Sequence, residues 1–172
     1  QKNGKFNNEI IKIDNCKIDE NIRPNSTMEK LSSLKLAFDQ NGTVTAATSS
    51  PLTDGAAATL ICEENFAKEN NLEIFGRIVS TAVEGCDPNF MGLGPISATK
   101  KALERAKLTI NEIDIVELNE AFASQSLACI KDLEIDPNKV NLDGGALALG
   151  HPRGATGARI TGKAASLLKR EN

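Results

Sequence analysis

A glycine-rich stretch, GGALALGHPRGATGAR (residues 144–159), holds the only histidine of the chain, His151. Its first half is rich in glycine and other small residues, which let a backbone and a bound molecule approach closely. Its second half has the composition of a helix start, where unpaired N–H groups and a partial positive charge are exposed. The pattern predicts a glycine-lined loop that leads into a final helix.

His151 has two interpretations on this evidence. The positive end of a helix disfavours the imidazolium ion, so the ring is expected to stay neutral. A neutral imidazole can act as a base or as a hydrogen-bond donor near pH 7. The alternative is a capping or turn histidine with a structural role. The stretch alone leaves both open.

Outward from this stretch, apolar strand patterns alternate with helical patterns from residue 41 to residue 172. Strands are expected at 42–46, 74–83, 113–118 and within 141–149, and helices at 56–68, 96–106, 120–131 and 156–168. Such alternation predicts an α/β fold, with a mixed, mostly parallel sheet and helices on both faces. Residues 1–40 are polar and predict an N-terminal arm with a short helix beginning near Thr27, capped by Ser26 or Thr27.

The sequence ELNEAFA (residues 117–123) places two polar residues directly after a predicted strand. In open α/β sheets the carboxyl ends of the strands form the edge where ligands bind. Asn119 offers a donor and an acceptor that can hold a water or a carbonyl oxygen. The structural alternatives are a helix N-cap for Asn119 and a first-turn acid for Glu120.

Two further segments carry weaker signals. TAATSSPLTDGAAA (residues 45–58) sets small and hydroxyl side chains before a helix start, where an anionic or amide-bearing ligand can bind. NFMGLGP (residues 89–95) sets Phe90 and Met91 beside glycines, which suits an apolar wall over a ligand. An ordinary capped turn and a surface loop are the respective alternatives.

Composition excludes several classes of function. The net charge of −3 and the 3% aromatic content argue against a nucleic-acid partner, which needs a basic face or stacking platforms. No apolar run approaches the roughly 20 residues that span a bilayer, so no membrane partner is expected. The cysteines are widely spaced without a CxxC pair, which predicts reduced thiols of an intracellular protein and no metal site. A generic nucleotide-binding domain is disfavoured because both glycine-rich phosphate motifs are missing.

Taken together, the motifs resemble the C-terminal half of the thiolases, acyltransferases that act on acyl-coenzyme A. The matching segments are DGAAA at 54–58, MGLGP at 91–95, NEAFA at 119–123 and the stretch at 144–159, with a further familial run between residues 23 and 38. The resemblance covers the chain from about residue 20. It implies that residues 41–172 are a thiolase C-terminal domain and that residues 1–40 end the preceding half.

The resemblance implies a role for five residues. His151 matches the histidine that activates a nucleophilic cysteine and contributes to an oxyanion hole. Asn119 matches the asparagine that holds a water in the same hole. Ser50 matches a serine that contacts the pantetheine arm of CoA, and Met91 and Phe122 match residues that line the thioester end of that tunnel. The local sequence departs from the family at one adjacent position, where Arg153 replaces a commonly apolar residue.

Thiolase chemistry needs two cysteines, a nucleophile and a proton-exchanging cysteine in a CxGxG-type segment. None of the four cysteines, Cys16, Cys62, Cys86 and Cys129, has that glycine context. We therefore expect a fragment that lacks the final cysteine-bearing strands and is inactive alone.

The resemblance implies acyl transfer between 3-ketoacyl-CoA and CoA, by thiolytic cleavage or Claisen condensation, as in fatty acid β-oxidation. It implies CoA as co-substrate, no tightly bound cofactor, and a homo-oligomer, dimer or tetramer, at full length. Cytoplasm, mitochondrial matrix and peroxisome are not separated. The alternative is a non-catalytic structural or CoA-binding domain.

Overall fold

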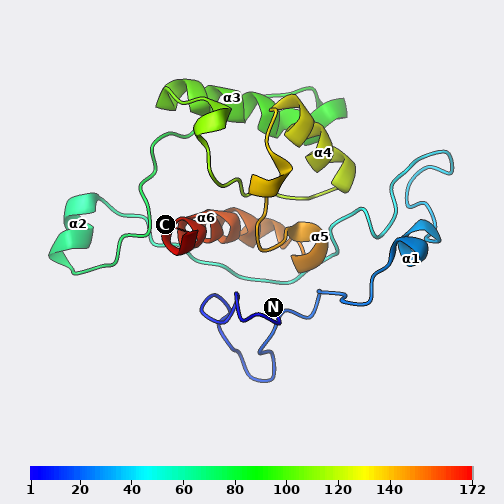
Figure 1. Ribbon diagram of the computed structural model, residues 1–172, viewed down its shortest axis with the longest axis horizontal. Helices are drawn as coiled ribbons and strands as arrows, with labels where there is room; N and C mark the ends of the chain where they lie inside the picture. Colours follow the sequence, from blue (N-terminus) through cyan, green and yellow to red (C-terminus); the bar gives the residue numbers. More distant parts are fainter. Residues whose placement is uncertain (172) are drawn as a thin grey trace.

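The computed structural model describes residues 1–171, and the segments that it shows as regular structure are helical (Figure 1). The α-helices are α1 (Met28–Ser32), α2 (Glu64–Glu69), α3 (Gly94–Ala106), α4 (Ala123–Asp132), α5 (Ala146–Leu149) and α6 (Arg153–Glu171). The 3-10 helices are η1 (Pro88–Leu93), η2 (Ile110–Glu112) and η3 (Pro137–Lys139).

Helix α6 lies at the centre of the molecule. Helices α3 and α4 lie on one side of it, and the N-terminal segment lies on the other (Figure 1). The most deeply buried large side chains are Leu167 of α6 and Cys129 of α4. Among residues 1–171, no helix has both the length and the apolar character needed to cross a membrane.

The chain between residues 53 and 75 runs beside α6 and in the same direction. Its contacts progress along the helix, from Gly55 against Pro152, through Thr59 against Gly162, to an ion pair between Glu73 and Lys169. A Cβ added at Gly55 would lie 2.9 Å from Pro152, and a Cβ added at Gly162 would lie 3.0 Å from Thr59. The two glycines therefore let this segment lie close to α6.

Several sequence expectations are confirmed. Helix α1 begins after Thr27, whose hydroxyl accepts a hydrogen bond from the Lys30 amide at 3.3 Å. Helix α3 carries Pro95 in its first turn, where the missing N–H costs nothing, and ends at Lys107 in the left-handed conformation. Helix α6 covers the expected helix 156–168 and begins three residues earlier.

Two expected helices are wrong in extent. The helix expected at 56–68 is reduced to α2, and residues 56–63 lack regular structure. The helix expected at 120–131 begins only at Ala123, because Phe122 is extended and forms an antiparallel bridge with Ser49. Pairing with a distant segment therefore delays the start of α4.

The expected strands are present in residues 1–171 only as isolated bridges, without an extended sheet. Thr45 pairs with Leu36 in antiparallel fashion, and Val116 pairs with Val140 in parallel. Residues 74–83 form no bridge, and Val83 in this segment is 90% exposed. A strand needs a hydrogen-bonded neighbour, and within the described chain these apolar residues have none. The strand expected within 141–149 is replaced by α5 and the loop before it.

Candidate functional site

The structure brings Asn119 and His151 together from two loops. The Asn119 side-chain nitrogen Nδ2 lies 3.4 Å from Nε2 of the imidazole ring. Asn119 precedes α4, and His151 lies between α5 and α6. Both side chains are part-buried. The two residues singled out by the sequence therefore form one site.

Asn141 holds the loop that carries Asn119. Its Oδ1 accepts from the Leu118 amide at 2.9 Å, and its Nδ2 donates to the Leu118 carbonyl at 2.9 Å. Asn141 adopts a left-handed backbone with φ of 48°, which asparagine tolerates better than most residues. Because one side chain satisfies both backbone groups of Leu118, the residue next to Asn119 is fixed.

Glu120 joins the Asn119 loop to the loop that leads to His151. Its carboxylate accepts from Asn141 Nδ2 at 2.7 Å and from the Leu147 amide of α5 at 3.1 Å. The carboxylate fills the space beside Gly145, where an added Cβ would lie 2.2 Å from the carboxyl carbon. The first-turn interpretation of Glu120 is wrong, and so is the N-cap interpretation of Asn119, because the cap position of α4 is Phe122.

His151 is fixed at its backbone and at its ring. Its amide donates to the hydroxyl oxygen of Thr53 at 3.2 Å, and its ring Nδ1 lies 2.8 Å from Oγ1 of Thr156 in α6. The Thr53 side chain occupies the space beside Gly150, where a Cβ would lie 2.3 Å from the hydroxyl oxygen. Gly150 has a φ of 93°, so glycine is required there for its conformation as well as for space.

The segment around Ser50 lies against the Asn119 loop. The Ser50 amide donates to the Ala121 carbonyl at 3.0 Å, and the Ala123 amide donates to the Thr48 carbonyl at 2.9 Å. The side chain of Ser50 is half-buried. The structure therefore places Ser50 near Asn119, as expected for residues of one site.

Phe122 lines an apolar groove beside this segment. Its ring meets Phe38 edge to face, with the ring centroids 6.2 Å apart. The other residues that line the groove include Val44, Phe90, Leu93 and Ala128. Met91 is 74% exposed, and its neighbours Phe90 and Leu93 rather than Met91 line this groove. The structure therefore supports the expected apolar wall around Phe122 but does not bring Met91 into it.

Among the described residues, three buried polar atoms have no hydrogen-bond partner: Glu117 Oε1, Asn119 Oδ1 and Arg159 Nε. Burial raises the pKa of Glu117 to about 7, although the positive charges of Arg159 and Lys163 oppose this shift. An unpartnered buried acceptor is costly, so the free Oδ1 of Asn119 is a position where a donor from a water or a ligand would bind favourably.

A group of charges, here called the Asp143 cluster, lies just before the glycine-rich loop. It comprises Asp143, Lys5, Glu9, Lys163 and Arg170. Lys163 lies 2.5 Å from Asp143 and 2.7 Å from Glu9, and Lys5 and Arg170 also pair with Asp143. Burial alone would raise the pKa of Asp143, but hydrogen bonds from Arg170, Lys163 and Lys5 outweigh it and hold that pKa well below its usual range.

The cysteines lie apart from this chemistry. Cys129 is buried in α4, where its sulfur approaches the Gly92 carbonyl at 3.5 Å, and Cys16, Cys62 and Cys86 are exposed. In the part of the chain that the structure describes, no hydrogen bond joins a cysteine to His151. Within residues 1–171, the site therefore brings an imidazole and an amide together without a cysteine contact.

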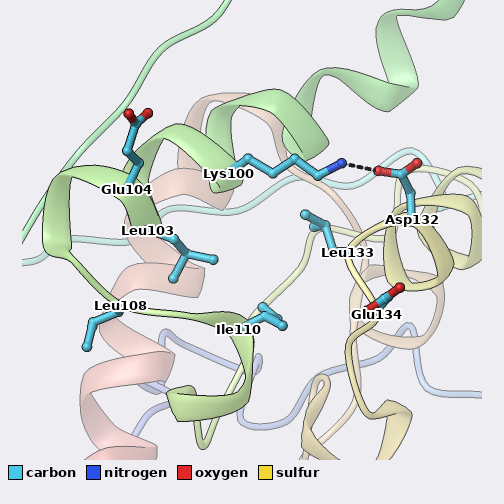
Figure 2. A pocket seen from close by; sticks show the side chains of 8 residues that line it. All are labelled: Lys100, Leu103, Glu104, Leu108, Ile110, Asp132, Leu133 and Glu134. Carbon is cyan, nitrogen blue, oxygen red and sulfur yellow. Dashed lines mark hydrogen bonds and ion pairs between the residues drawn. The ribbon is translucent and has the colours of Figure 1, made fainter.

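A second groove lies between α3 and α4 and is separate from the predicted site residues. Leu103, Ile110 and Leu133 converge there beneath an ion pair between Lys100 and Asp132 at 2.7 Å (Figure 2). None of the five predicted site residues lines it. Its charged rim and small apolar floor match the contact between two packed helices.

Sequence reasoning missed the supporting residues Thr53, Asn141 and Thr156, and it did not foresee the bonds that Glu120 makes to Asn141 and Leu147. For Thr156 a signal was present, because a hydroxyl five residues after a histidine can reach the ring from the first turn of a following helix. Asn141 and Thr53 carried no comparable signal, since their partners lie 23 and 98 residues away.

Comparison with known families matches both parts of the chain. The model described as "Thiolase, N-terminal domain" matches residues 1–65, and the one described as "Thiolase, C-terminal domain" matches residues 72–172. The boundary expected at residue 40 stays a prediction.

The chain is also similar to named relatives. It is 52% identical over 179 residues to a 3-ketoacyl-CoA thiolase of Vibrio parahaemolyticus, covering 96% of this chain and 46% of that protein. The dimeric peroxisomal thiolase of Saccharomyces cerevisiae has a TM-score of 0.90 and 44% identity, covering 98% of this chain and 44% of the yeast chain. Human mitochondrial 3-ketoacyl-CoA thiolase in complex with CoA has a TM-score of 0.83 and 43% identity, covering 90% and 39%.

These similarities settle the fold. The TM-scores confirm the expected α/β architecture, although residues 1–171 show its sheet only as isolated bridges. The chain spans about half the length of the relatives that it matches.

Proposed function

This chain belongs to the thiolase family, and from that premise we propose that it supplies the histidine and the asparagine of an acyl-transfer site. The reaction is transfer of an acyl group between 3-ketoacyl-CoA and CoA, in the direction of thiolysis or of condensation. The observation that carries the proposal is the pairing of Asn119 with His151, 3.4 Å apart and beside an unpartnered Asn119 oxygen.

In this proposal His151 acts as the base. Its Nε2 accepts the proton of a cysteine thiol, and the resulting thiolate attacks the substrate's keto carbon. Cleavage of the adjacent carbon–carbon bond leaves an acyl group on sulfur and releases acetyl-CoA, once a second thiol has protonated the departing carbon. CoA then takes the acyl group. None of the four cysteines of this chain matches either thiol in sequence context.

Asn119 stabilises charge in the same proposal. A negative oxygen develops when the thioester carbonyl is attacked or an enolate forms, and preorganised donors at such a position are worth about 3 kcal/mol each. The free Oδ1 of Asn119 is positioned to accept from a water, which in turn donates to that oxygen. The Glu120 carboxylate and the Asn141 amide keep this geometry fixed before substrate binds.

We assign CoA as co-substrate, with Ser50, Met91 and Phe122 on its binding side. Support for Ser50 and Phe122 is their proximity to the Asn119 loop, and a structurally similar human enzyme was solved with CoA. Met91 has weaker support because its side chain is largely exposed. A homo-oligomer is also proposed, because a close structural neighbour is a dimer.

The test is a chimera in which residues 1–172 replace the matching segment of the Vibrio parahaemolyticus enzyme. We expect thiolysis of 3-ketoacyl-CoA by the chimera. His151→Ala is expected to lower kcat at least a thousandfold, and Asn119→Ala about a hundredfold, because a base and an oxyanion donor are lost. Unchanged unfolding temperatures would show that folding is preserved.

The competing function is a CoA-binding domain without catalysis. It is favoured by the absence of a cysteine contact to His151 in the described residues. Calorimetric titration of the 172-residue chain with CoA, combined with the chimera, separates the two. An active chimera that retains full turnover with His151→Ala would contradict the proposed role of the histidine, and CoA binding by an inactive chimera would support the alternative.

A further inference from the structure

Thr156 presents its hydroxyl to the ring nitrogen of His151 that faces away from Asn119. The hydroxyl oxygen lies 2.8 Å from Nδ1 and 3.1 Å from the carbonyl oxygen of Pro152. Thr156 is 4% exposed and Pro152 is half-buried, so this geometry is largely shielded from water. Both contacts join Thr156, in the first turn of α6, to the two residues just before that helix.

The hydrogen count at Thr156 favours one tautomer of His151. A hydroxyl has one hydrogen to donate, and a carbonyl oxygen can only accept. The bond to Pro152 therefore uses the hydrogen of Thr156, and toward His151 the same oxygen acts as an acceptor. An acceptor at 2.8 Å pairs with a protonated Nδ1.

The contact on the other side of the ring agrees with this assignment. A neutral imidazole with a proton on Nδ1 has a lone pair on Nε2. Asn119 presents its Nδ2, a donor, to that atom at 3.4 Å. The remaining Oδ1 of Asn119 is the unpartnered acceptor already described. Donor meets acceptor at each step from Asn119 through His151 and Thr156 to Pro152.

We propose that Thr156 is a positioning residue that holds His151 in the Nδ1–H form, so that Nε2 is the proton acceptor on the side of Asn119. The tautomer is a property of the chain itself, whereas its meaning for acyl transfer rests on the proposed function. In that reaction, Nε2 takes the proton of a thiol to give a thiolate, and the imidazolium keeps its Nδ1–H bond to Thr156. No reorientation of the ring is needed.

The single histidine makes the test direct. In the 172-residue chain labelled with 15N at histidine, long-range 1H–15N correlation at pH 8 reports one imidazole. We expect a protonated-type signal for Nδ1 and an unprotonated-type signal for Nε2. Thr156→Val should lower the ratio of the Nδ1–H to the Nε2–H form about tenfold, the effect of losing one hydrogen bond. Thr156→Ser keeps a hydroxyl and should keep the wild-type spectrum.

Thr161→Val is the matched control. Thr161 lies on the same helix and donates to the Gly157 carbonyl four residues before it, as Thr156 does to Pro152, but it is exposed and does not contact His151. It should leave the tautomer unchanged. A wild-type spectrum dominated by the Nε2–H form, or by an average of both forms, would overturn the assignment whether or not Thr156→Val folds.

Activity separates this inference from the proposed function. In the chimera, Thr156→Val should lower kcat about tenfold with little change in KM and should alter the pH profile, and Thr156→Ser should restore both. If the Nδ1–H form is observed but His151→Ala leaves the chimera active, the proposed function fails and the tautomer assignment stands. If Thr161→Val shifts the tautomer as much as Thr156→Val, the role of Thr156 is refuted.

Discussion

The loop around His151 and the segment at residues 74–83 differ in how they satisfy their own groups. Around His151, the Glu120 carboxylate accepts from the Leu147 amide, and Thr53 and Thr156 contact the His151 amide and ring. In the segment at 74–83, Ile78 and Val79 are 56% and 61% exposed, and no backbone bridge is formed. The loop around His151 is therefore held by side-chain hydrogen bonds from distant segments. The segment at 74–83 contacts its surroundings through single groups, such as Ser80 against the Ala102 carbonyl of α3, and forms no strand pairing.

This difference shows that local site geometry and sheet formation have separate requirements. The site is held by side chains that the chain itself contains, whereas a strand is stable only against another strand. We therefore expect substitutions around the His151 loop to lower the free energy of unfolding more than substitutions at exposed positions of residues 74–83.

The largest effect is expected at the Asp143 cluster, which stands at the start of the His151 loop. Asp143→Ala would leave Lys163, which is 6% exposed, without its shortest ion pair. Glu9 remains a partner of Lys163 at 2.7 Å, so we expect a loss near the lower end of the about 3–5 kcal/mol that removal of one partner of a buried ion pair costs. The measurement is the free energy of unfolding by urea titration with circular dichroism. Glu73→Ala removes an exposed pair on the same helix and should cost less than about 1 kcal/mol. Equal losses for the two variants would contradict the comparison.

The next effect concerns the space beside Gly145. Gly145→Ala places a Cβ 2.2 Å from the carboxyl carbon of Glu120, so the carboxylate must leave its position against α5. We expect a loss of about 1–3 kcal/mol in stability. Gly157→Ala is the control, because it lies within α6 with nothing within 4 Å of the new methyl group and should gain up to about 1 kcal/mol. Thermal unfolding of both variants is the measurement, and a neutral Gly145→Ala would weaken the role given to Glu120.

A pH effect is expected at Glu117. Its pKa of about 7 lies above the ordinary value of 4.5, so the folded chain binds more protons than the unfolded chain between these values. Stability should therefore fall as pH rises from 4.5 to 7, by about 1–2 kcal/mol after allowance for partial exposure. Glu117→Gln should remove this decline and leave stability at pH 4 unchanged.

Urea unfolding at pH 4, 6 and 8 measures this decline, and Glu104→Gln on the exposed face of α3 is the control. Parallel pH curves for the wild type and Glu117→Gln would be evidence against a buried carboxyl at position 117.

The smallest effect is expected in the segment at 74–83. Val83 is 90% exposed, so Val83→Thr should change the stability of the 172-residue chain by less than about 0.5 kcal/mol. In the chimera we expect the same substitution to cost about 1 kcal/mol, because a longer chain offers this apolar segment a neighbour to pack against. A large loss in the isolated chain would show that the segment is already constrained there.

The sequence singled out Asn119 and His151, which the structure places 3.4 Å apart, and it predicted the presence of α3 and α6. Asn119 and His151 were found because each stands in a short motif whose composition is unusual for a loop. Periodicity predicted α3 because the apolar positions and the first-turn proline that mark this helix lie within its own sequence.

Features that depend on distant partners could not be predicted. The start of α4 is set by the bridge between Ser49 and Phe122, so no pattern within residues 120–131 reveals it. Residues 74–83 have the composition of a strand, but pairing is a property of two segments. The role of Asn141 likewise depends on its fit to Leu118, which is 23 residues away.

The Asp143 cluster also has a consequence for how the chain folds. Glu9 and Lys163 are 154 residues apart, so their contact closes almost the whole chain into a ring. Closure of so long a loop is entropically expensive and comes late. Asp143 belongs to the same cluster and stands just before the glycine-rich loop, so the placement of that loop is coupled to this closure.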